Sequence, residues 1–176
     1  MLKAVYFLYV LMFIQPSDNS ILWDESYKLK WTDFRGLPND NIDTAAITAS
    51  GITLDLSAKT SQTQLIEFNA IVEARFYPDQ SWYRKEMASS FILSHEQLHF
   101  DITELYARKF RQQVDNTTFS IQIKKELSMI NKLINKDLKA MQEKYDSDSN
   151  FSRNMETQRK WQHYIQSELQ KLYKYK

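Results

Sequence analysis

Residues Ser89 to Tyr106 have the sequence SSFILSHEQLHFDITELY, and the rest of the fold is built around them. Its apolar and aromatic residues, with His95 among them, recur at steps of three and four, which is the spacing of one face of an α-helix. Ser89 or Ser90 can accept a hydrogen bond from the free backbone N–H groups of the first turn. The sequence therefore predicts a long amphipathic helix that begins at these serines.

The residues before this helix predict a small β-sheet. Apolar and polar side chains alternate over 27–31 and over 52–56, and 64–77 is a longer β-rich run. Ser50–Gly51 is expected to be a turn between two of these runs. Because the connections are short, we expect three or four strands, mostly antiparallel.

The residues after the helix predict two more helices. Apolar residues recur at helical spacing over 123–145 and again over 161–172, and the polar segment 146–154 separates them. The expected fold class is therefore α+β: a small antiparallel β-sheet packed on the helix 89–106, followed by two long C-terminal helices.

The composition excludes several kinds of chemistry. The 176 residues include no cysteine, which excludes thiol catalysis, thiolate zinc fingers, disulfides and cysteine-ligated iron–sulfur clusters. Two glycines are too few for a glycine-rich phosphate-binding loop. The 23 basic and 22 acidic side chains give a net charge of +1, so we expect no nucleic acid partner.

The N-terminus has the layout of a secretory signal. One basic residue, Lys3, precedes an apolar run over 4–14 and a polar stretch that contains Pro16. The apolar run is too short to span a bilayer, which needs about 20 residues. We therefore expect a signal peptide over 1–20, with cleavage near Ser20. Residues 21–176 would then be one secreted or periplasmic domain without a membrane anchor. A buried N-terminal strand or helix is the alternative.

The predicted helix contains the motif His-Glu-x-x-His at residues 95–99. At 100° per residue, His95 and His99 differ by about 40° around the helix axis, so both imidazoles can bind one metal ion. Neutral imidazole suits Zn²⁺, which acidifies a bound water and polarises a carbonyl. Glu96 lies beside the pair and can take the proton of that water and deliver it to a leaving amine. A core-facing histidine pair without metal is the alternative.

A catalytic zinc ion normally has three protein ligands, and the third is not obvious. Asp101 and Glu104 project from other faces of the helix, so we expect them to be a supporting or surface carboxylate and an i,i+4 ion-pair partner. His163 is expected to face solvent, opposite the apolar face of its helix. Asp146 or Asp148 could supply an oxygen ligand from the segment after the second helix, although a plain turn there is equally expected.

Three parts of the chain resemble the family catalogued as domain of unknown function 922, described as secreted zinc-dependent proteases. They are Leu29–Gly36 (LKWTDFRG), His95–Ile102 (HEQLHFDI), and Tyr145-Asp146 followed by Gln158 and Trp161. The resemblance implies a zincin-like metallopeptidase domain with His95 and His99 as metal ligands and Glu96 as the catalytic base.

The chain departs from this family pattern at one position. The family has a histidine a few residues after the Tyr-Asp pair, whereas this chain has Phe151, which cannot bind zinc. Our leading hypothesis is an exported zinc metallopeptidase-like hydrolase that acts on a peptide or protein, held at a sheet edge for which 64–77 is the candidate. The alternative is an inactive exported binding module on the same scaffold, and a purely structural helical partner protein ranks last.

Overall fold

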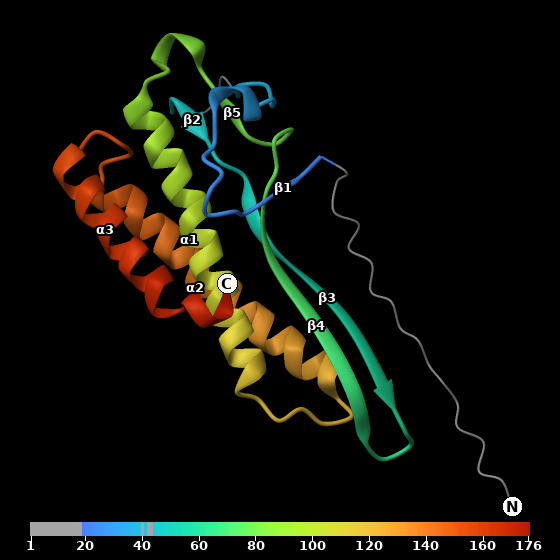
Figure 1. Cartoon of the computed structure of the whole chain (residues 1–176). Helices are drawn as coiled ribbons and strands as arrows, with labels where there is room; N and C mark the ends of the chain where they lie inside the picture. Colours follow the sequence, from blue (N-terminus) through green and yellow to red (C-terminus); the bar gives the residue numbers. More distant parts are fainter. Residues whose placement is uncertain (1–18, 40, 42–43) are drawn as a thin grey trace, which may run out of the picture.

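The computed structural model describes residues 19–39, 41 and 44–176 (Figure 1). The expected signal peptide over 1–20 falls almost entirely outside these residues. The described part is an α+β structure in which small antiparallel sheets lie beside three long helices, as the sequence predicts. Within it, no helix is both long enough and apolar enough to cross a membrane.

The larger sheet is built on a long β-hairpin. Its strand order is β1-β4-β3 with antiparallel pairing, and a second sheet pairs β2 with β5 in the same sense. The predicted strands over 52–56 and 64–77 are thereby confirmed. The second of them, β4, has a strand on both sides only at Arg75 and Phe76, where β1 pairs with it, and the rest of β4 pairs with β3 alone. The strands are β1 (Ile21–Leu22), β2 (Ala46–Ile47), β3 (Ser50–Thr60), β4 (Leu65–Phe76) and β5 (Trp82–Tyr83).

The expected strand over 27–31 is wrong. Leu29 is buried, as the alternation of apolar and polar residues requires, but its backbone N–H donates to the side-chain oxygen of Gln97 at 2.8 Å rather than to a neighbouring strand. The chain then turns into a 3₁₀ segment, Trp31–Asp33, where the Asp33 carboxylate accepts from the backbone of Lys30 at 2.7 Å. Side chains therefore satisfy the backbone that a sheet would otherwise satisfy.

The expected turn at Ser50–Gly51 is also wrong. Both residues belong to β3, where Ser50 pairs with Phe76 and Gly51 with Arg75. A Cβ added to Gly51 would lie 3.4 Å from the ring of Tyr77, which is ordinary contact, so this glycine is not required for a turn. The chain instead reverses after β3, where Ser61 N–H donates to the carbonyl of Gln64 at 2.8 Å.

The three helices confirm the 3.6-residue periodicity. Ser89 is the N-cap of the first helix, and its hydroxyl accepts from the N–H of Ile92 at 3.1 Å. The second helix continues to Asp148, so the break expected from 146 begins three residues later, because the buried side chain of Tyr145 anchors the last turn. The helices are α1 (Ser90–Asp115), α2 (Ile123–Asp148) and α3 (Met155–Lys171).

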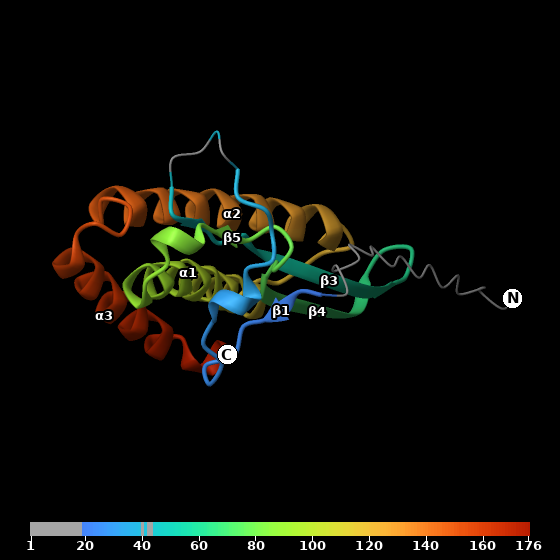
Figure 2. The same cartoon turned by 90° about the horizontal axis from the view of Figure 1, so that it is seen from above.

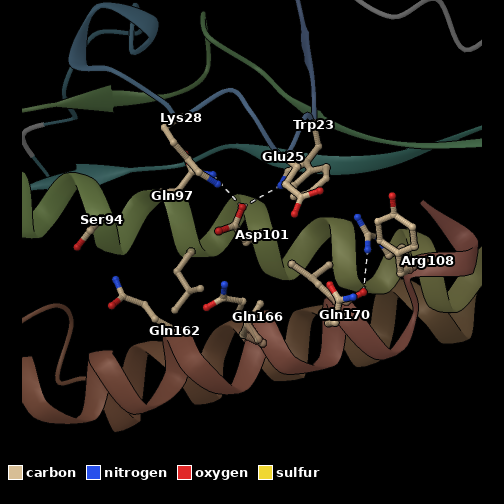
Figure 3. Close-up of a pocket in the computed structure, with 14 residues that line it drawn as sticks. Trp23, Glu25, Lys28, Ser94, Gln97, Asp101, Arg108, Gln162, Gln166 and Gln170 are labelled. Carbon is tan, nitrogen blue, oxygen red and sulfur yellow. Dashed lines mark hydrogen bonds between the residues drawn. The ribbon is translucent and has the colours of Figure 1, made fainter.

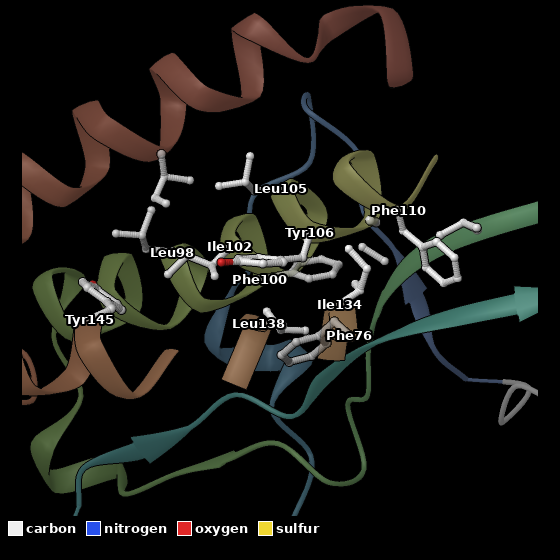
Figure 4. Packing of buried hydrophobic residues seen from close by; sticks show 14 of the residues in the cluster. Phe76, Leu98, Phe100, Ile102, Leu105, Tyr106, Phe110, Ile134, Leu138 and Tyr145 are labelled. Carbon is white, nitrogen blue, oxygen red and sulfur yellow. The ribbon is translucent and has the colours of Figure 1, made fainter. Parts of the chain in front are cut away.

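Helix α1 lies at the centre of the molecule, between α2 and α3 and against the β3–β4 hairpin (Figure 2). It is buried nearly all around, as expected for a helix inside a core. Figure 4 shows Phe100 and Ile102 of α1 meeting Phe76 of β4 and Leu138 of α2. The rings of Phe76 and Phe100 lie 5.8 Å apart between centroids. The motif is therefore held on the most constrained helix of the fold.

A buried ion-pair cluster ties α1 to the end of α3. Glu104 accepts from Arg108 at 2.8 Å, which confirms the expected i,i+4 pair, and both side chains are 3% exposed. Arg111 donates to the same carboxylate oxygen at 3.0 Å. Arg108 also donates to the backbone oxygen of Leu169 at 2.8 Å, so the cluster fixes the C-terminal half of α1 against α3.

Candidate metal centre

Two helices bring three candidate ligands together. His95 and His99 lie one turn apart on α1, and Asp146 lies in the last turn of α2. The Oδ1 atom of Asp146 is 3.1 Å from Nε2 of His95 and 2.9 Å from Nε2 of His99, and the two Nε2 atoms are 3.1 Å apart. The three atoms therefore form a nearly equilateral triangle. Among the described residues this is the one group of three such side chains with the spacing of a metal site.

The size and chemistry of this triangle fit zinc. In a tetrahedral site with bonds of about 2.0–2.1 Å, ligand atoms are about 3.3–3.4 Å apart. The observed edges of 2.9–3.1 Å are slightly shorter. Two imidazoles and one carboxylate are a ligand set that catalytic zinc sites use, and three protein ligands leave the fourth position for water or substrate. The donor set is thus suited to zinc.

A glutamine on α2 fixes the tautomer of His99. The Nε2 amide group of Gln142 donates to the backbone oxygen of His99 at 2.9 Å, and because a carbonyl only accepts, the amide cannot be flipped. Its Oε1 therefore faces Nδ1 of His99, which must carry a proton. In the neutral ring, Nε2 is then a bare acceptor that faces the Asp146 carboxylate, and this contact is stable only with a proton or a metal ion between the two atoms.

The contacts between Asp146 and the two histidines shift the pKa values of His99 and Asp146. Burial lowers the pKa of His99, but the hydrogen bond to Asp146 and the charge of Glu96 outweigh it and raise that pKa above its usual value. Burial raises the pKa of Asp146, but the hydrogen bonds to His95 and His99 outweigh it and hold that pKa far below the usual range. The structure therefore favours an ionised carboxylate facing a positive group, either an imidazolium or a metal ion.

Tyr145 forms the wall behind the two imidazoles. Its ring stacks on His95 with centroids 4.5 Å apart and meets His99 at 5.0 Å, and Trp161 of α3 supports its other side at 5.5 Å. The side chain is fully buried, and burial raises the pKa of its hydroxyl well above the ordinary value. The sequence patterns place Tyr145 and Trp161 on the apolar faces of their helices and within the family pattern, but they give neither residue a role in a metal site.

Glu96 lies beside the triangle without belonging to it. The residue is 4% exposed, and its negative charge contributes to the raised pKa values of both His99 and Tyr145. Among the described residues its carboxylate makes no hydrogen bond. The turn is held by the Thr48 hydroxyl, which donates to the backbone oxygen of Glu96 at 3.2 Å. This places an uncommitted carboxylate near the cluster.

The other candidates lie elsewhere. Asp148 accepts from Lys144 at 2.7 Å and from the indole of Trp161 at 3.2 Å, so the structure places it in a different cluster. His163 is exposed, as expected, and Phe151 is exposed by 55% in the turn that follows α2. Of the two carboxylates considered from the sequence, only Asp146 meets the histidines.

Asp101 lines a pocket on another side of α1. Its Oδ1 accepts from the Trp23 indole and from the Gln97 amide, both at 2.8 Å (Figure 3). The pocket has a volume of about 480 Å³ and lies between α1 and α3. Burial raises the pKa of Asp101, while these hydrogen bonds oppose the shift. Since Gln97 also binds the backbone of Leu29, Asp101 anchors the N-terminal segment to the motif helix.

The comparisons with known proteins bear on this region. Residues 78–154 match the model of a family described as "Bacterial protein of unknown function (DUF922)". The match confirms the family that the sequence resembles, and its range includes the motif helix and Asp146, whereas Leu29–Gly36, Gln158 and Trp161 lie outside it. Searches of curated proteins and of solved structures found no match for this chain.

Proposed function

From the DUF922 match over 78–154 and the triangle of donor atoms, we propose that the protein is an exported zinc-dependent metallopeptidase-like hydrolase. The observation on which the proposal rests is the convergence of His95, His99 and Asp146 at 2.9–3.1 Å from one another. Export rests on the signal-like residues 1–20 of the sequence.

Each residue of the site has a role in this proposal. His95, His99 and Asp146 hold the ion, which when bound supplies the acidification of a water molecule and the polarisation of the substrate carbonyl. Glu96 accepts the proton of that water and passes it to the leaving amine, because its carboxylate is close and free of other hydrogen bonds among the described residues. Tyr145 covers the rear of the imidazoles and keeps water from that side.

The segment that leads into β3 is the place where a peptide would bind. The Thr48 hydroxyl donates to Glu96 O at 3.2 Å, and the hydroxyls of Ser50 and Thr103 lie 2.7 Å apart, so this segment lies along the motif turn. β3 is the edge strand of the larger sheet, and an extended peptide can add to such an edge through main-chain hydrogen bonds. A peptide or protein substrate is thus the class that this arrangement favours.

Metal analysis of the purified protein tests the zinc site. We expect about one zinc ion per chain, and we expect His95→Ala to lose it. His163→Ala should retain the zinc, because His163 is exposed on α3 and is not one of the three clustered side chains. The protein is first loaded with zinc, and unbound zinc is then removed by dialysis. A wild-type protein that retains no zinc, or an equal zinc content in both variants, would rule out the proposed metal centre.

The variant Glu96→Gln tests catalysis separately from zinc binding. It should retain zinc and lose about 10²–10⁴-fold in the rate of cleavage of fluorescently labelled casein, because proton transfer by a positioned carboxylate contributes that much. A wild-type protein that binds zinc but cleaves nothing, with Glu96→Gln indistinguishable from it, would support the inactive binding module. The presence of Phe151 in place of the histidine of the family pattern is the observation that favours this second candidate.

A further inference from the structure

A second glutamine, on α3, contacts the motif helix. Gln158 is fully buried, and its Nε2 donates to the backbone oxygen of Phe91 at 3.2 Å and to the hydroxyl of Ser94 at 2.9 Å. Because the Phe91 carbonyl only accepts, the nitrogen end of the amide must face it. The other end, Oε1, is therefore an acceptor, and it is buried without a partner.

A matching donor lies on the same turn of α1. Phe91 and Ser94 precede His95 by four residues and by one, so the Gln158 amide packs against the turn of α1 that carries this histidine. Nε2 of His95 points into the triangle, and its Nδ1 is buried without a hydrogen-bond partner. When Nε2 binds a metal, Nδ1 carries the ring proton and is a donor.

The other histidine shows the same arrangement completed. Gln142 binds the backbone oxygen of His99 through Nε2 and faces Nδ1 of that ring through Oε1. Each imidazole therefore has one glutamine amide anchored to the backbone of α1 near it. Metal-binding histidines generally donate their second N–H to a carboxylate, a carbonyl or a water, which fixes the ring and its tautomer.

We propose that Gln158 is a positioning residue of the metal centre: its Oε1 accepts from Nδ1–H of His95, directly or through one buried water, and so holds the bare Nε2 of that ring toward Asp146. The proposal rests on the proposed function for its biological meaning, but the bond itself is a property of the chain. The buried hydroxyl of Tyr145, which stacks on His95 and also has no partner, is the competing candidate.

Nuclear magnetic resonance of the full chain with ¹⁵N-labelled histidine tests the bond. In the zinc-loaded wild type we expect slowly exchanging Nδ1–H signals from both His95 and His99. Gln158→Leu, which keeps the apolar stem and removes the amide, should abolish the protected signal of His95, leave that of His99, and weaken zinc binding by about 10–100-fold. Gln166→Leu, an exposed glutamine two turns along α3, is the matched control and should change none of these.

Three results would overturn the inference. One is an unprotected Nδ1–H of His95 in the zinc-loaded wild type. Another is an unchanged His95 signal and zinc affinity in folded Gln158→Leu. The third is loss of the signal in Tyr145→Phe, which would make the hydroxyl the partner. If Gln158→Leu does not fold, Gln158→Glu keeps the acceptor oxygen and should retain the signal.

The experiments distinguish failure of the zinc proposal from failure of the role proposed for Gln158. If the wild type binds no zinc but His95 in the metal-free, neutral protein is the Nδ1–H tautomer, the zinc proposal fails and the role of Gln158 stands. If zinc binds with equal affinity to the wild type and to Gln158→Leu, the zinc proposal stands and the role of Gln158 fails.

Discussion

Replacing Asp146 with alanine should remove most of the stabilisation that zinc gives to the fold. One oxygen of Asp146 lies within 3.1 Å of both Nε2 atoms, so the variant deletes one of the three proposed protein ligands. Loss of a residue that merely supports a ligand costs about 10–100-fold in metal affinity, and loss of the ligand itself should cost at least the upper value.

The stability change follows from mass action. At a free zinc concentration 100 times the wild-type dissociation constant, zinc stabilises the wild type by about 2.7 kcal/mol. A 100-fold weaker variant at the same zinc concentration gains about 0.4 kcal/mol. For a chain of this size about 1 kcal/mol corresponds to roughly 2–4 °C in Tm, so the zinc-dependent rise in Tm should shrink by about 5–9 °C.

Calorimetry with and without zinc measures this difference. Asp148→Ala is the matched control, because Asp148 has the same side chain two residues away but binds Lys144 and Trp161. We expect its zinc-dependent shift in Tm to equal that of the wild type. Equal shifts for the Asp146 and Asp148 variants, or a larger loss for Asp148, would show that the carboxylate of the triangle is not a ligand.

Further changes probe the packing and the acid response of the site. Arg108→Met should lower the free energy of unfolding in urea by about 3 kcal/mol, because it breaks a buried ion pair. This is the low end of the usual range, since Arg111 still contacts the carboxylate of Glu104. An unfolding midpoint like that of the wild type would contradict this. Gly36→Ala should cost about 1–3 kcal/mol, since its Cβ would lie 2.9 Å from a backbone oxygen, whereas Gly51→Ala should be nearly neutral at 3.4 Å from a ring. Equal midpoints for the two glycine variants would refute the steric argument. Protons compete with zinc for the imidazoles, and the raised pKa of His99 means that zinc affinity, measured by titration, should already fall above pH 6.5 as the solution is acidified. Affinity that is flat from pH 8 to 5 would exclude imidazole ligands.

Local spacing is sufficient to find the parts of the site that lie on one helix. His95 and His99 share a face because residues four apart on an α-helix always do, and Glu96 follows from the same geometry. The sequence offers Asp146 and Asp148 as candidates for a third ligand, with a plain turn as the alternative, and both residues lie near the end of α2. The choice between them depends on the rotation of α2 against α1, which no pattern within α2 encodes.

The sequence does not predict features that depend on contacts between residues far apart in the chain. Gln142 lies 43 residues from His99, and Gln158 lies 64 residues from Ser94, so neither spacing suggests a shared site. The segment 27–31 alternates like a strand because one side faces the core, yet its backbone binds a side chain on α1. Alternation of apolar and polar residues indicates that one side of an extended segment is buried. It does not indicate whether a neighbouring strand pairs with that segment.

Local patterns of residues are sufficient for the α+β class, the three helices and the pairing of two imidazoles on one of them, because periodicity and the geometry of one helical turn are local properties. Packing between the helices selects Asp146 over Asp148, and it places one amide at His99 and another against the turn that precedes His95. Those choices depend on how α2 and α3 rotate and slide against α1, and that packing is set by contacts between residues far apart in the chain.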